Sequence, residues 1–278
     1  MFTNEDLSAV SAAPSRISRR TALMVTFGAL AIVYALWNVE QLSFIVYPFR
    51  LFVTYVHEAG HSLAALLSGG EIRGFEVYAN GSGLARTAGG SRFLILPAGY
   101  LGAAFFGALL FYLVNRFHMA RSLSVCIGVV LVIFSALYAR PANGVPVALV
   151  VGLLFGLALI ALGIKVSAIP NLIVLNVLAI MTALNAVLDL LFLVRSDDIS
   201  VRTASGIIRN DAAAFSAEIT RGVIPPIVWA LLWAAIAIAM IGAAVYFSLI
   251  QPALHEKPLR TPRVGNLLRK IRSNDSIQ

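Results

Sequence analysis

The chain has 278 residues, of which 59% are hydrophobic and only 12% are charged, and its formal net charge is +8. A soluble domain of this length could not bury so much apolar surface, so the composition excludes an ordinary globular protein and indicates a membrane protein. Apolar runs of about 18 residues or more favour transmembrane helices over a β-barrel. We find no nucleic-acid-binding module, so we expect the lipid bilayer, and no nucleic acid, to be the partner of the basic residues.

In chain order, the apolar runs predict an all-α polytopic membrane protein with about six to eight transmembrane helices. The seven candidate spans cover residues 21–38, 44–67, 93–114, 122–138, 145–164, 169–194 and 223–249. Residues 1–20 then form a cytoplasmic N-terminal segment, residues 21–250 the membrane domain, and residues 251–278 a basic C-terminal tail. This orientation follows from the excess of Lys and Arg in the inner loops, although seven spans would leave the basic tail outside.

The segment 71–90, between the second and third spans, is too polar to cross a membrane. Phe75 and Val77 alternate with polar residues, and Asn80-Gly81 is a strong hairpin-turn signal, so the segment predicts a short β-hairpin. Its flanking arginines favour a cytoplasmic location. The hairpin could bind an extended substrate by strand addition or could simply connect two spans.

The second span contains the sequence His57-Glu58-Ala59-Gly60-His61, an H-E-x-x-H motif. On a helix the two histidines lie four residues apart on one face and can bind one zinc ion. Glu58 adjoins that face and can take a proton from an activated water molecule. A charged glutamate within a membrane span costs roughly 2.5–3.5 kcal/mol or more, which favours a functional role over a structural one.

A catalytic zinc ion has three protein ligands and one open position, so a third ligand is required. Asp189 is the acidic residue of the later spans, and it lies at a depth comparable to that of the two histidines, which makes it the expected ligand. Asn185, one turn earlier, could orient this carboxylate or bind substrate. Asp197 and Asp198, just beyond the span, remain alternative ligands.

At these residues the chain resembles the site-2 proteases, intramembrane zinc metallopeptidases, and most closely the B-like branch of that family. The resemblance extends over residues 50–235 and rests on the motif at 57–61 and on Leu67-Ser68-Gly69-Gly70, Asn80-Gly81-Ser82-Gly83, Ala98-Gly99-Tyr100-Leu101-Gly102, Asp189 and Ser196-Asp197-Asp198. It implies a protease that cleaves transmembrane segments of other proteins. The chain departs from the usual third-ligand motif of the family, because Leu188-Asp189-Leu190 lacks the glycine that normally follows the acid.

Together these features predict a multi-pass zinc metalloendopeptidase of the cell membrane. We expect Zn²⁺ to be held by His57, His61 and Asp189, Glu58 to be the general base, and transmembrane proteins to be the substrates. One alternative is an inactive relative that binds transmembrane helices as a scaffold or chaperone. A metal transporter is a further alternative, but it would require more acidic or histidine residues along a path through the membrane.

Overall fold

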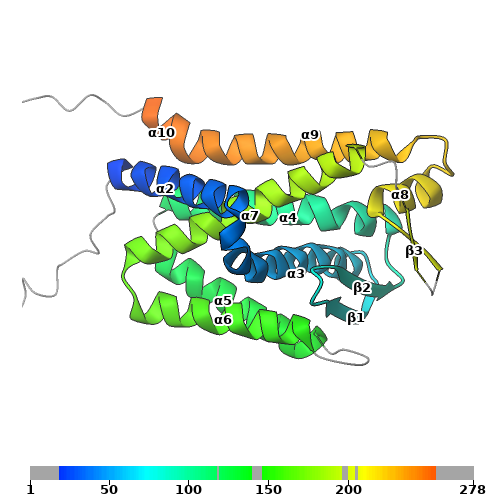
Figure 1. Ribbon diagram of the computed structural model, residues 1–278, viewed down its shortest axis with the longest axis horizontal. Coiled ribbons are helices and arrows are strands. Elements are labelled where there is room, and N and C mark those ends of the chain that lie inside the picture. Colours follow the sequence, from blue (N-terminus) through cyan, green and yellow to red (C-terminus); the bar gives the residue numbers. More distant parts are fainter. Residues whose placement is uncertain (1–18, 118, 140–145, 196–199, 204–205, 255–278) are drawn as a thin grey trace, which may run out of the picture.

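The structure is a computed structural model and describes residues 19–117, 119–139, 146–195, 200–203 and 206–254. Each of the seven apolar runs forms a long helix in it (Figure 1). These helices are α2 (Arg19–Asn38), α3 (Ser43–Leu67), α4 (Arg92–Phe117), α5 (Ala120–Tyr138), α6 (Val147–Lys165), α7 (Ala168–Arg195) and α9 (Pro226–Val245). The mostly helical fold and the hairpin between the second and third of these helices confirm the predicted architecture.

Five of the described helices, α4, α5, α6, α7 and α9 with its extension to Ile250, are long and apolar enough to cross a membrane. The chain is therefore a multi-pass membrane protein by helix length and composition. Helices α2 and α3 do not meet this standard. The apolar part of α2 is limited to Leu23–Leu36, and α3 carries Arg50, Glu58 and the two motif histidines among its apolar residues.

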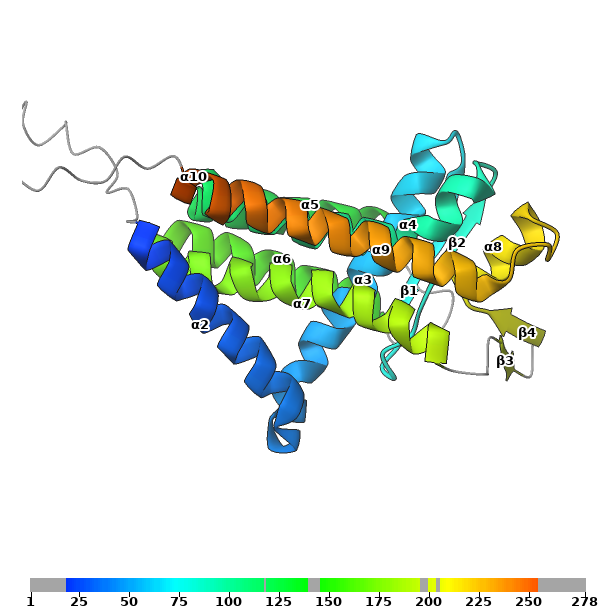
Figure 2. The same cartoon turned by 90° about the horizontal axis from the view of Figure 1, so that it is seen from above.

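The start of α2 and the end of α9 lie at the same end of the molecule, whereas the hairpin lies at the opposite end (Figures 1 and 2). Helices α2 and α3, joined by the short 3-10 turn η1 (Glu40–Leu42), form a V and cross the length of the bundle only once between them (Figure 2). The cytoplasmic location of the N-terminus and of the hairpin stays a prediction, and in the structure the start of α2 and the hairpin lie at opposite ends (Figures 1 and 2). The sequence-based count took α2 and α3 as two spans, whereas neither is among the five described helices that are long and apolar enough to cross a membrane.

The end of α9 lies at the same end of the molecule as the start of α2 (Figure 1). Beyond α9 the chain continues through the π-helical turn η2 (Tyr246–Ile250) and the short helix α10 (Gln251–Leu254). The residues of the tail after 254 lie outside the described part of the chain, as do residues 1–18.

The predicted hairpin consists of β1 (Glu71–Val77) and β2 (Gly83–Ala88), which pair antiparallel. Its tip folds back along α3, because the Tyr47 hydroxyl donates to the carbonyl of Ala79 at 2.7 Å and the Thr54 hydroxyl donates to that of Gly81 at 2.8 Å. Phe75 of β1 is fully buried against the ring of Tyr55. The hairpin is thus fixed to the helix that carries the H-E-x-x-H motif.

Three short elements between α7 and α9 were not anticipated from the sequence. They are β3 (Ser200–Thr203) and β4 (Gly206–Arg209), which form a second antiparallel hairpin, and α8 (Asp211–Ile219). Helix α8 begins at a conventional cap, where the Asn210 side chain accepts a hydrogen bond from the backbone of Ala213 at 2.9 Å. It lies at the hairpin end of the molecule (Figure 1).

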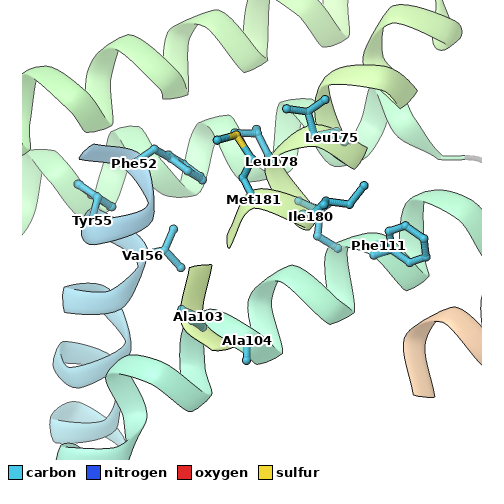
Figure 3. Close-up of a cluster of buried hydrophobic side chains, with 14 of the residues drawn as sticks. Phe52, Tyr55, Val56, Ala103, Ala104, Phe111, Leu175, Leu178, Ile180 and Met181 are labelled. Carbon is cyan, nitrogen blue, oxygen red and sulfur yellow. The ribbon is translucent and has the colours of Figure 1, made fainter. Parts of the chain in front are cut away.

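The main hydrophobic core lies between α3, α4 and α7 (Figure 3). Side chains from these three helices meet there, among them Phe52, Tyr55, Val56, Ala103, Ala104, Phe111, Leu175, Leu178, Ile180 and Met181. Close approach of α3 to α4 depends on Gly60, where a Cβ atom would overlap the carbonyl oxygen of Ala98. Small residues at such crossings let membrane helices pack backbone to backbone. The core therefore holds the motif helix rigidly against α4.

Candidate metal centre

Helix α3 presents His57 and His61 from consecutive turns, as their four-residue spacing predicts. His61 and Glu58 are both buried, each with 7% of its surface exposed. The backbone of Ala85, in the middle of β2, hydrogen-bonds the Glu58 carboxylate. The motif thus lies between its own helix, the start of α4 and the β2 strand.

Three potential ligand atoms converge at this point. His57 Nε2 and His61 Nε2 lie 3.1 Å apart, and the Asp211 Oδ2 atom lies 3.2 Å from the first and 3.3 Å from the second. Within the described residues, these three side chains form a group of His, Cys, Asp or Glu that could hold a metal ion. The group joins two residues of α3 to the first residue of α8.

The dimensions of this triangle fit a tetrahedral zinc ion. Ligand atoms about 2.0–2.2 Å from zinc in tetrahedral geometry lie roughly 3.3 Å or slightly more from one another. The three observed separations of 3.1–3.3 Å are close to that edge length. Two imidazoles and one carboxylate are also a usual set of donors for a catalytic zinc ion.

The surroundings of His61 prepare its ring for metal binding. His61 Nδ1 lies 2.7 Å from the carbonyl oxygen of Ile95, which can only accept a hydrogen bond. The Nδ1 atom therefore carries a proton, and a metal ion at the centre of the triangle would take the place of the proton that Nε2 shares with Asp211. The ring of His57 packs edge-on against Tyr100, with the ring centroids 4.5 Å apart, so both imidazoles are held by α4.

Asp211 reaches the triangle because α8 is anchored to the bundle. Phe215 of α8 is buried against the rings of Trp229 and Trp233 of α9. At the other side of α8, Glu218 forms an ion pair with Arg92 of α4 at 2.7 Å. These contacts place the first turn of α8 over the two histidines.

The Asp211 carboxylate is in the form that can bind a metal. Its burial would raise the pKa, but the charge of His61 and the hydrogen bonds with His57 and His61 outweigh that effect and hold the pKa below its ordinary range. Metal ligands of this type must be deprotonated. The carboxylate of Asp211 therefore stays ionised at neutral pH.

At the third ligand the structure differs from the sequence-based expectation. Asp189 of α7 is not part of the triangle but lines a small cavity beside His57, together with Asn185. The Asn185 side chain donates a hydrogen bond to Asp189 at 2.6 Å, which is the orienting contact that their spacing suggests. The difference arises because α8 brings the Asp211 carboxylate to within 3.2–3.3 Å of both Nε2 atoms, whereas α7 carries Asp189 to the cavity beside His57. Asp197 and Asp198 lie outside the described residues.

Asp211 was missed because only acidic residues within the apolar spans or directly after them were considered as the third ligand. A local signal does precede it, since Asn210-Asp211 followed by Ala212-Ala213-Ala214-Phe215 is typical of a helix start with an N-cap and an acidic first turn. That signal predicts α8 but not its position over α3. The position depends on contacts between residues 154 positions apart in the chain.

A family model described as peptidase M50B-like matches residues 25–244, which include both histidines, Glu58 and Asp211. The chain belongs to the peptidase M50B-like family. Membership of this family confirms the resemblance drawn from the sequence motifs and indicates a metallopeptidase. No curated protein and no solved structure matches the chain.

In this member of the M50B-like family, Gly99 of α4 leaves room for the metal centre. A Cβ atom at Gly99 would overlap Nε2 of both His57 and His61, the two atoms that face Asp211. We therefore expect Gly99→Ala to weaken metal binding by about 10-fold or more, as loss of ligand orientation does in other metal sites. Metal content of the purified variant, measured by elemental analysis, checks this expectation.

Gly242→Ala in α9 is the matched control, because a Cβ atom there would meet no atom within 4 Å. It should retain the metal and the melting temperature of the parent protein. A Gly99→Ala variant that melts like the control and binds the metal as tightly would show that the space beside Gly99 is not needed for binding.

Proposed function

We propose that the protein is an intramembrane zinc endopeptidase that hydrolyses peptide bonds in or near transmembrane segments of other membrane proteins of the cell membrane. The observation that carries this proposal is the triangle of His57 Nε2, His61 Nε2 and Asp211 Oδ2, with edges of 3.1–3.3 Å. Family membership supports the same chemistry. We assign His57, His61 and Asp211 as the zinc ligands.

Zinc in such a site makes a water molecule nucleophilic at neutral pH and polarises the scissile carbonyl. Glu58 follows His57 directly on α3 and is close enough to both histidines and to Asp211 to feel their charges. We assign it the role of general base, which takes the proton of the attacking water and delivers it to the leaving amine. Because Glu58, His57 and His61 all lie on α3, the helix fixes the position of Glu58 relative to the two histidine ligands.

The β1–β2 hairpin is suited to present an extended substrate to these residues. Strand β2 pairs with β1 along one edge, and its other edge is turned toward Glu58, where the backbone of Ala85 hydrogen-bonds the carboxylate. A Cβ atom at Gly83 would lie only 2.6 Å from Glu58 Oε1, so the backbone of β2 itself approaches the general base. We propose that an unwound substrate segment lies along this strand, since main-chain hydrogen bonds give affinity without requiring a particular sequence.

Substrates have to unwind before cleavage, because the carbonyl groups of a transmembrane helix are already hydrogen-bonded within it. A helix-breaking Gly, Pro or Asn near the cleaved bond should therefore favour hydrolysis, and a run of leucines should oppose it. Glu58 lies against strand β2, and the hairpin lies toward one end of the molecule (Figure 1), so we place the cut near the corresponding end of the substrate helix.

The test is cleavage of synthetic transmembrane peptides by the purified protein in lipid nanodiscs, followed by mass spectrometry of the products. The wild type should hold about one zinc ion per chain and cleave peptides with a central Asn-Gly pair. A chelator should abolish cleavage, and added Zn²⁺ should restore it. A protein that binds these peptides but leaves them uncut at full zinc occupancy would be a scaffold for transmembrane helices, and the hydrolase proposal would fail.

A further inference from the structure

A polar cavity adjoins the metal centre. It has a volume of about 150 Å³ and is bounded by α3, α4 and α7, with His57, Tyr100, Asn185 and Asp189 among the residues that line it. His57 belongs to both the cavity and the ligand triangle. A group bound in the cavity would therefore lie directly beside the reacting atoms.

Asp189 is the acidic residue of this cavity. Its carboxylate accepts a hydrogen bond from Asn185 at 2.6 Å. In the described part of the chain, no Lys or Arg lies within ion-pair distance of it. The charge of Arg50 acts on Asp189 from a distance, because the Arg50 guanidinium lies beside Gly81 at the hairpin tip. An anionic side chain on a membrane helix is costly unless it meets a partner, and such residues commonly mark functional sites.

The shape and lining of the cavity suit a long, flexible cationic side chain. Its volume of about 150 Å³ gives room for one side chain. Val53, Ala103 and Ala186 add small apolar patches to walls that are mainly polar, and Asp189 and Asn185 provide oxygen acceptors. A lysine can place its methylene stem along these patches and its ammonium group at the acceptors.

The cavity is also connected with the hairpin that we assign to substrate binding. Thr54 lines the cavity, and its hydroxyl donates to the carbonyl of Gly81 at the hairpin tip. Thr54 is also one of the side chains that a Cβ atom at Gly83 would meet. The start of β2 and the cavity therefore share one wall, and a segment bound along β2 can direct a side chain toward the cavity.

We propose that this cavity, with Asp189 and Asn185 as its acceptors, is a specificity subsite for a lysine or arginine next to the cleaved bond of the substrate. The inference rests on the proposed function, because a cleaved bond exists only if the protein is a peptidase. The preference for a cationic side chain can still be measured by peptide binding alone. Asp189 is then a specificity-determining residue rather than a zinc ligand.

The experiment measures peptide binding to the Glu58→Gln protein in nanodiscs, so that no cleavage interferes. The probes are three versions of one synthetic transmembrane peptide with a central Asn-Gly pair, which differ only in carrying Lys, Leu or Asp beside that pair, first on one side and then on the other. We expect the Lys peptide to bind about 10-fold or more tightly than the Asp peptide at one of the two positions, the effect of one charge-assisted hydrogen bond.

Adding Asp189→Asn should remove this preference, and Asp189→Lys should reverse it in favour of the Asp peptide. Adding Glu40→Gln is the matched control. Glu40 lies in η1 between α2 and α3, outside the hairpin, the cavity and the ligand triangle, and its replacement should leave the preference unchanged. Zinc content, measured on every variant, should stay the same.

Equal binding of the Lys and Asp peptides at both positions would overturn the subsite. So would a preference that survives Asp189→Asn, or loss of zinc from that variant, which would make Asp189 a ligand. A preference that is present and depends on Asp189, in a protein whose wild type cleaves none of the peptides, would support the subsite and refute the hydrolase function. The two proposals can therefore fail separately.

Discussion

Glu58→Gln should lower the rate of peptide cleavage by about 10²-fold or more, the usual contribution of a general base, while zinc content stays at the wild-type level. Glutamine has nearly the same shape as glutamate and can still accept the hydrogen bond from Ala85, so the buried site should keep its packing. What it lacks is a basic oxygen that can take a proton. The measurement is the initial rate of cleavage of a transmembrane peptide, with elemental analysis of the same sample.

Glu40→Gln serves as the control for Glu58→Gln, because it makes the same chemical change in η1, outside the hairpin and the metal centre. It should cleave at the wild-type rate. If Glu58→Gln cleaves as fast as this control, Glu58 is not the base and the hydrolase mechanism is wrong. If Glu58→Gln loses its zinc, its effect on the rate says nothing of proton transfer, and Glu58 has to be regarded as a residue that supports the ligands.

Asp211→Ala should weaken zinc binding by about 100-fold or more and abolish cleavage, because it removes a charged ligand rather than an outer contact, whose loss alone costs 10–100-fold. The protein should remain folded. Helix α8 keeps its Asn210 cap and its contacts between Phe215 and the tryptophans of α9. Loss of an acid from the first helical turn costs only about 0.3–1 kcal/mol. Zinc affinity is measured by competition with a chelator, and folding by thermal melting.

Asp189→Asn is the matched comparison, since it removes a carboxylate that also lies beside His57 but outside the ligand triangle. It should keep zinc affinity within a few-fold of wild type, well short of the loss expected for a ligand. The sequence alone led to the opposite expectation, in which Asp189 binds zinc and its replacement weakens binding by about 10-fold. Loss of zinc from Asp189→Asn but not from Asp211→Ala would return the third ligand to α7.

Much of this molecule follows from local sequence patterns. Long apolar runs must form helices in a membrane, because backbone groups have no other partners there, and each of the seven runs does so. The β1–β2 hairpin follows from alternation around Asn80-Gly81, and the approach of His57 to His61 follows from the 3.6-residue period of α3. These features depend on residues that are close in the chain, so they can be predicted from the sequence alone.

The third carboxylate and the course of the first two helices depended instead on tertiary structure. Asp211 meets His57 across 154 positions of the chain, and only the packing of α8 against α4 and α9 brings it there, while Asp189 is carried by α7 to the neighbouring cavity. In the same way, hydropathy marks α2 and α3 as apolar but does not show that they meet at an angle and form a V (Figure 2). Local patterns determine which residues form a helix and which of them share a face. Contacts between helix faces that are far apart in the chain are decided by how all the helices pack together.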